Sequence, residues 1–85
     1  MSVAEEIEQR LRAAFEPGAL EVINESHLHA GHAGDDGSGE SHFRVVIRAD
    51  VFSQMNRLAR HRAVHAAIGP ELVARIHALT LDISG

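Results

Sequence analysis

Histidine is the residue type with the most chemical potential in this chain, which has seven histidines among 85 residues. Three of them, His27, His29 and His32, lie within a stretch from 25 to 41 that is rich in glycine, serine and acidic residues. Neutral imidazole is a common ligand of zinc, copper, nickel and iron, so this spacing indicates a metal site. The alternative is a solvated loop that happens to be rich in histidine, because metal sites normally need three or four ligands.

The last histidine, His77, follows a short helical pattern and precedes an alternating apolar segment. A single histidine flanked by Ile76 and Leu79 is more often part of a core or a sheet edge than a metal ligand. The residues alone therefore leave both roles open for His77.

A second group of chemically active residues is basic. It consists of Arg57, Arg60, His61, Arg62 and His65. A recognition helix in a DNA groove has a similar composition, whereas the alternative is a solvated helix face that pairs with acidic residues. The chain has twelve acidic residues against eight Arg and no Lys, with a net charge of −4, which argues against general binding to nucleic-acid phosphates.

The composition excludes several kinds of catalytic site. Without cysteine, the chain has no disulfide, no thiolate nucleophile and no cysteine-ligated metal of its own. No Ser, His and Asp motif is present, and the glycines of the stretch from 25 to 41 match no phosphate-binding fingerprint. We therefore expect a protein that is not an enzyme.

The segments that must position these residues begin with an amphipathic helix. Ser2 is the expected N-cap, and Pro17-Gly18 ends the helix. A short strand from Leu20 to Asn24 follows. The apolar positions of the helix are Val3, Ile7, Leu11 and Ala14 or Phe15.

The most regular alternation in the chain lies at 42–48 and predicts a half-buried strand. Phe43, Val45 and Ile47 fall on one face of this strand. The other face receives His42, Arg44, Val46 and Arg48. Residues 25–41 then form a long loop between two strands of an antiparallel hairpin, and loops of that length are usually functional or disordered.

The remaining segment predicts two helices and a third strand. Leu58, Val64, Ala67 and Ile68 fit the apolar side of a helix that covers Leu58 to Ala67. Gly69-Pro70 breaks this helix, and a short helical segment runs from Pro70 to Arg75. A strand from His77 to Ile83 follows, with its odd-numbered residues, His77 included, projecting to one side.

The element order predicts one α+β domain over residues 1–85. Its three-stranded mixed sheet is covered by helices, and the third strand lies parallel to the second through a right-handed crossover. The chain has no run of 18 apolar residues, and its N-terminus lacks the features of an export signal. We therefore expect a cytoplasmic protein without a membrane partner.

Four strings, read together in this order and spacing, resemble the BolA family over the chain from about Leu20 to Leu81. They are Asn24-Glu25-Ser26-His27, Glu40-Ser41-His42-Phe43-Arg44-Val45, Arg60-His61-Arg62-Ala63-Val64-His65 and Ile76-His77-Ala78-Leu79. The resemblance implies a fold like that of a class II KH domain, in agreement with the predicted element order.

The resemblance also implies a heterodimer with a monothiol glutaredoxin, in which the two proteins hold a bridging 2Fe-2S cluster together with glutathione. On the BolA side the family uses the histidine of the last motif, here His77, and a Cys or His of the loop. Since this chain has no cysteine, the resemblance implies His32 as the loop ligand, with His29 as the alternative and His27 the least favoured. Histidine ligation raises the reduction potential of such a cluster relative to all-thiolate ligation.

A second function remains open from the same resemblance. Some BolA-family members are described as transcriptional regulators of stress responses and cell shape, and KH-like domains often bind nucleic acid. The Gly-x-x-Gly loop of RNA-binding KH domains is missing here, so a DNA-binding role would rest on Arg57, Arg60, His61 and Arg62. A homodimer of the apo-protein is the other partner arrangement that we consider.

Overall fold

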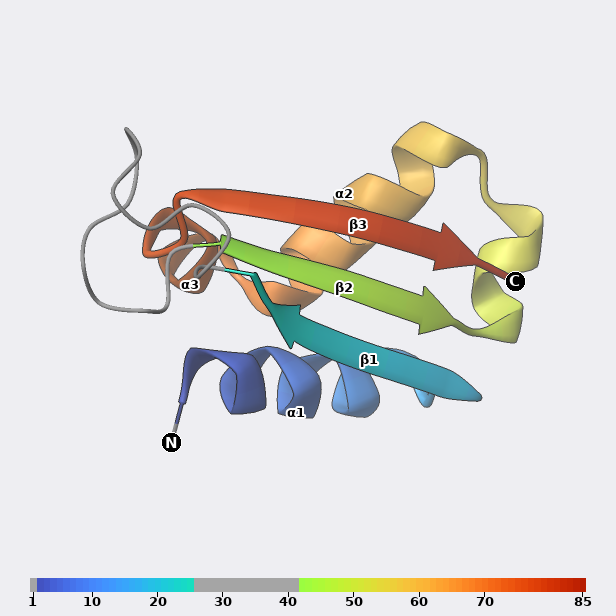
Figure 1. Cartoon of the computed structure of the whole chain (residues 1–85). Helices are drawn as coiled ribbons and strands as arrows, with labels where there is room; N and C mark the ends of the chain where they lie inside the picture. The colour runs from blue at the N-terminus through green and yellow to red at the C-terminus, as the bar shows by residue number, and fades with distance from the viewer. Residues whose placement is uncertain (1, 26–41) are drawn as a thin grey trace.

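A computed structural model describes residues 2–25 and 42–85 of the chain. Its centre is a sheet in the order β1-β2-β3, formed by β1 (Ala19–Asn24), β2 (His42–Arg48) and β3 (Ala78–Ser84) (Figure 1). β1 pairs with β2 antiparallel, and β2 pairs with β3 parallel. The predicted hairpin and the predicted parallel third strand are both confirmed.

The register of the strands separates an apolar face from a polar one. Ile47 lies opposite Leu20 on β1 and Ile83 on β3, and Val45 lies opposite Val22 and Leu81. Because paired residues point to the same side of a sheet, these side chains form one apolar face. The other face of β2 carries Arg44, Val46 and Arg48, as the alternation predicts.

The first helix, α1 (Val3–Phe15), packs its Ile7 and Leu11 into the core. The Ser2 hydroxyl accepts a hydrogen bond from the backbone N–H of Glu5 at 3.2 Å, which confirms the predicted N-cap. The helix ends at Glu16, before Pro17, where the backbone has φ of 46° in the left-handed region. A glutamate therefore occupies the conformation that glycine usually supplies at a helix end.

After β2 the chain forms a 3-10 helix, η2 (Asp50–Gln54), which the sequence does not predict, and then α2 (Arg57–Ile68). Asn56 caps α2, and Val64 and Ile68 are buried. The prediction that Leu58 faces the core is wrong, because its side chain is 57% exposed. The N-terminal end of α2 extends past β3 in Figure 1, so the first turn of this helix has no sheet beneath it.

The second break in the helical region lies at Gly69, which has φ of 96° and joins α2 to α3 (Pro70–Ala74). The Arg10 guanidinium donates to the carbonyl of Ile68 and so satisfies the end of α2. Leu72 and Ile76 are buried beyond this turn. The predicted start of the last strand at His77 is one residue early, because β3 begins at Ala78 and His77 lies in a bend.

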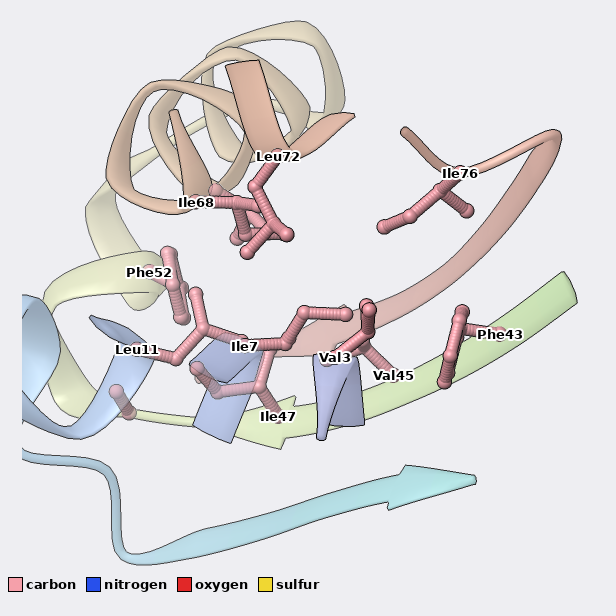
Figure 2. Close-up of a cluster of buried hydrophobic side chains, with 12 residues drawn as sticks. Val3, Ile7, Leu11, Phe43, Val45, Ile47, Phe52, Ile68, Leu72 and Ile76 are labelled. Carbon is pink, nitrogen blue, oxygen red and sulfur yellow. The ribbon is translucent and has the colours of Figure 1, made fainter. Parts of the chain in front are cut away.

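The core lies between the apolar face of the sheet and the helices (Figure 2). It joins Val3, Ile7 and Leu11 of α1 with Phe43, Val45 and Ile47 of β2, with Phe52 of η2, with Val64 and Ile68 of α2, and with Leu72 and Ile76. Each fully buried large apolar side chain contributes about 1.5–3 kcal/mol. No helix within residues 2–25 and 42–85 is long and apolar enough to span a membrane.

Candidate functional site

Two histidines that are far apart in the sequence lie side by side at one end of the sheet. The ring centroids of His42 and His77 are 5.2 Å apart, and the ring planes are inclined at 52°. The parallel register brings them together, since His42 pairs with Ala78, the residue after His77. The predicted parallel pairing of the second and third strands is the feature that could have indicated this contact. The sequence motifs did not mark His42 as a site residue.

The two imidazoles differ in their exposure to solvent. His42 is the first residue of β2 and is only 6% exposed, whereas His77 is exposed. Buried Leu72 and Ile76 anchor the segment that leads to His77. The buried ring of His42 and this anchored backbone therefore hold His77 at a defined place on the surface.

This pair offers two nitrogen donors, fewer than a closed metal site requires. Among residues 2–25 and 42–85, no group of three or more His, Asp or Glu side chains converges on a point where a metal would bind. A closed metal site at His77 would therefore need ligands from outside these residues. The loop residues His27, His29 and His32 lie outside the described residues.

An apolar surface lies at the same end of the molecule. A shallow cavity of about 430 Å³ lies between α2 and α3. Figure 1 places α3 beside the start of β3, so this cavity and His77 belong to the same end. The lining residues are His65, Ala66, Pro70, Val73 and Ala74.

The basic residues predicted to form one helix face do not share one environment. The Arg60 guanidinium donates to the carbonyls of Phe52 at 2.9 Å, Met55 at 3.0 Å and Ile83 at 3.2 Å. Arg60 therefore links η2, α2 and β3, and its charge is engaged within the fold. Arg57 and Arg62 are exposed, and His61 is half-buried.

Comparison with known proteins identifies the family. The family model for BolA-like protein matches residues 11–84. The chain belongs to the BolA family. An uncharacterized Sinorhizobium protein from the cobS 5′ region is 54% identical over 83 residues, covering 96% of this chain and 89% of that protein.

Two proteins that are named BolA extend the comparison. The DNA-binding transcriptional regulator BolA of Escherichia coli K12 is 44% identical over 81 residues, covering 95% of this chain and 73% of that protein. The structure of BolA1 from Arabidopsis thaliana superposes with a TM-score of 0.82 at 32% identity, covering 99% of this chain and 92% of that one. The chain therefore has the BolA fold, as its motifs predict.

Proposed function

We propose that this BolA-like protein is an adaptor, not an enzyme, which binds a monothiol glutaredoxin and shares a bridging 2Fe-2S cluster with it. His77 is the ligand from the folded part of the chain. The observation that carries the proposal is the exposed His77 ring held beside the buried His42 ring, 5.2 Å away between centroids.

The donor set of the chain fits a shared cluster. A complete iron–sulfur site needs four ligands, which are usually thiolates, and this chain has no cysteine. The partner and its glutathione supply the thiolates, while His77 and a second histidine supply nitrogen. When bound, the cluster supplies a redox-active or transferable iron–sulfur group.

Three histidines are candidates for the second ligand. His32 is the first candidate, with His29 as the alternative, and His42 is a third candidate because its ring already lies against His77. His42 is buried, so its use as a ligand requires a shift of the ring toward the surface. The apolar cavity between α2 and α3 supports a protein partner at this end, because an interface needs apolar contact area next to the ligand.

The test is anaerobic reconstitution of the chain with a monothiol glutaredoxin, iron, sulfide and glutathione. We expect visible absorption and circular dichroism spectra that differ from those of glutaredoxin alone and that show mixed histidine and thiolate ligation. His77→Ala removes this difference. His61→Ala is the matched control, since it removes a histidine from α2 and leaves the spectra unchanged.

Single variants measured in the same reaction identify which loop histidine is the ligand. Loss of the mixed-ligand spectrum in His32→Ala, with His29→Ala unchanged, assigns His32, and the reverse result assigns His29. If the chain leaves the glutaredoxin spectrum unaltered, or if His77→Ala behaves like the unmodified chain, the proposed adaptor role is wrong.

DNA binding is the second candidate function, and the name of the Escherichia coli relative favours it. Within this chain the exposed charges of Arg57 and Arg62 are the groups suited to phosphate contacts. Arg57→Ala with Arg62→Ala should reduce the salt slope of duplex binding by about 2. Absence of duplex binding at low salt excludes this function.

A further inference from the structure

The outer edge of β3 presents backbone groups that are directed away from the sheet. The backbone N–H of Ala49 donates to the carbonyl of Ser84 at 3.1 Å, so Ser84 directs its backbone toward β2. Because successive residues of a strand direct their backbone groups to opposite sides, Leu79, Leu81 and Ile83 direct theirs to the outer edge. β3 is the last strand of the sheet on this side (Figure 1).

One of these outer groups is already engaged. The carbonyl of Ile83 accepts from Arg60 at 3.2 Å. In the part of the chain that the structure describes, no residue hydrogen-bonds to the backbone of Leu79 or Leu81 at this edge. An open edge of this kind can pair with another strand.

The open edge borders a basic groove. A cavity of about 440 Å³ is lined by residues 81–83 of β3, by Arg57, Arg60 and His61 of α2, and by Arg44. Asp82 is the one acidic side chain in this lining. Arg44 is paired with Glu25 at 3.2 Å, so the positive charge of the groove comes from Arg57 and Arg60 and exceeds the single negative charge of Asp82.

The groove continues into an apolar patch. A neighbouring cavity of about 400 Å³ is lined by Leu58 together with Arg57 and His61, which also line the groove. Leu58 is 57% exposed, which is the larger value of the two exposed large apolar side chains among the described residues. An open strand edge, cationic side chains and an apolar anchor thus lie next to one another.

We propose that this groove, formed by the edge of β3 and the first turns of α2, docks an extended acidic peptide segment of another protein. The segment adds to β3 as a fourth strand, pairs with Leu79 and Leu81, and places an apolar side chain on Leu58. Its carboxylates face Arg57. Strand addition of this kind derives affinity from main-chain hydrogen bonds and specificity from neighbouring side chains.

The charges of the groove favour this occupant over the others. A second copy of the chain, paired edge to edge, would bring two basic grooves together, and like charges repel. A nucleic acid would leave the N–H and C=O groups of the β3 edge without a complementary backbone, because phosphates and bases do not continue a strand ladder. An acidic peptide satisfies the charge and the backbone together.

The charged and apolar contacts of the groove lie away from the histidine end. Ile83 lies six residues beyond His77, which corresponds to about 20 Å along an extended strand, whereas Leu79 lies only two residues beyond it. This proposal does not depend on the proposed cluster, because His77 lines neither cavity of the groove.

The test uses two capped eight-residue peptides, one alternating glutamate with valine and the other aspartate with leucine, titrated into the full chain labelled with nitrogen-15. We expect saturable NMR shifts at the amides of Leu79 and Leu81, with slower amide exchange at these two residues. N-methylation of alternate peptide amides should weaken binding about tenfold or more, because it blocks the main-chain hydrogen bonds. Replacement of the acidic residues by lysine should abolish it.

Matched variants distinguish peptide binding in this groove from a general effect of charge on the helix. Arg57→Glu should weaken peptide binding about tenfold, and Leu58→Asp should have a similar effect. Arg62→Glu makes the same charge change on the same helix outside the groove, and it should alter affinity by less than about twofold. The NMR spectra of the free variants establish that each remains folded.

Several results would overturn the proposal. One is an absence of shifts at Leu79 and Leu81 with both peptides, and another is equal weakening by Arg57→Glu and Arg62→Glu. Concentration-dependent shifts of these amides without peptide would assign the edge to a second copy of the chain. Tighter binding of an oligothymidine than of either peptide, at the same amides, would assign it to nucleic acid.

Discussion

The two ends of β3 carry different chemistry but share one arrangement. At the first end a buried imidazole, His42, lies against an exposed one, His77. At the second end Arg60 is tied to three backbone carbonyls, while Arg57, one helical turn earlier, is exposed. In each pair the enclosed residue holds the structure together and the exposed residue is available to a partner.

Residue type and sequence position alone therefore do not assign a role. Arg57, Arg60 and Arg62 are alike in the sequence, yet the guanidinium of Arg60 is committed to the fold. His42 and His77 are both candidate ligands by chemistry, yet only His77 is exposed.

The largest effect is expected for Arg60→Ala. This change leaves the carbonyls of Phe52, Met55 and Ile83 without the guanidinium donor. Because hydrogen bonds from a charged group contribute more than neutral ones, we expect the free energy of unfolding to fall by about 3 kcal/mol. Urea denaturation followed by circular dichroism measures this loss.

Arg62→Ala is the matched control for Arg60→Ala. Its side chain is exposed on the same helix, so its unfolding free energy should change by less than about 0.5 kcal/mol. Equal losses in the two variants would contradict the structural role of Arg60 and restore a uniform basic face on α2.

The next effect concerns the turn that places α3 and the segment before His77. Gly69 has φ of 96°, and a Cβ added there would lie 2.8 Å from Nη1 of Arg10. Gly69→Ala should therefore destabilise the chain by about 2 kcal/mol, through backbone strain and displacement of Arg10. Gly18→Ala is the control, because its added Cβ meets no atom within 4 Å. Similar midpoints for the two variants in thermal unfolding would show that the Gly69 turn tolerates a side chain.

The smallest effect separates the two histidines. His42→Ala removes a buried ring and should cost about 1 kcal/mol or slightly more. His77→Ala removes an exposed ring and should change the unfolding free energy by less than about 0.5 kcal/mol. Chemical denaturation of both variants without a partner makes the measurement. A larger loss for His77→Ala than for His42→Ala would reverse the roles assigned to the pair.

Most of the fold follows from periodicity. The alternation at 42–48 predicts β2 with its faces correctly assigned, and the helical spacing from Val3 predicts α1. The 3-10 helix η2 shows no such pattern in the sequence. It is stabilised by the burial of Phe52 and by the hydrogen bond from Arg60 to the Phe52 carbonyl. Leu58 fits the apolar side of α2 but is exposed, because the first turn of the helix extends past the sheet. Periodicity predicts the apolar side of a helix, but it does not predict which turns of the helix pack against the sheet.

The candidate site is predictable in part. The family motif draws attention to His77, but the contact with His42 depends on the parallel register of β2 and β3, which brings together residues 35 positions apart. Ile76 is buried just before the bend at His77, and β3 begins at Ala78. The alternation of apolar residues alone predicts that the strand begins one residue earlier. His29 and His32 lie outside the described residues, so their role stays a prediction.

Pulsed EPR of the reduced cluster tests the central claim most directly. The chain, labelled with nitrogen-15 at histidine only, is reconstituted with unlabelled monothiol glutaredoxin, glutathione, iron and sulfide. Beside the coupling of the second histidine ligand, we predict a nitrogen-15 coupling from His77 that is present in the His61→Ala complex and lost in the His77→Ala complex. A cluster that forms in the complex without this coupling, or that retains it unchanged in His77→Ala, would contradict ligation by His77.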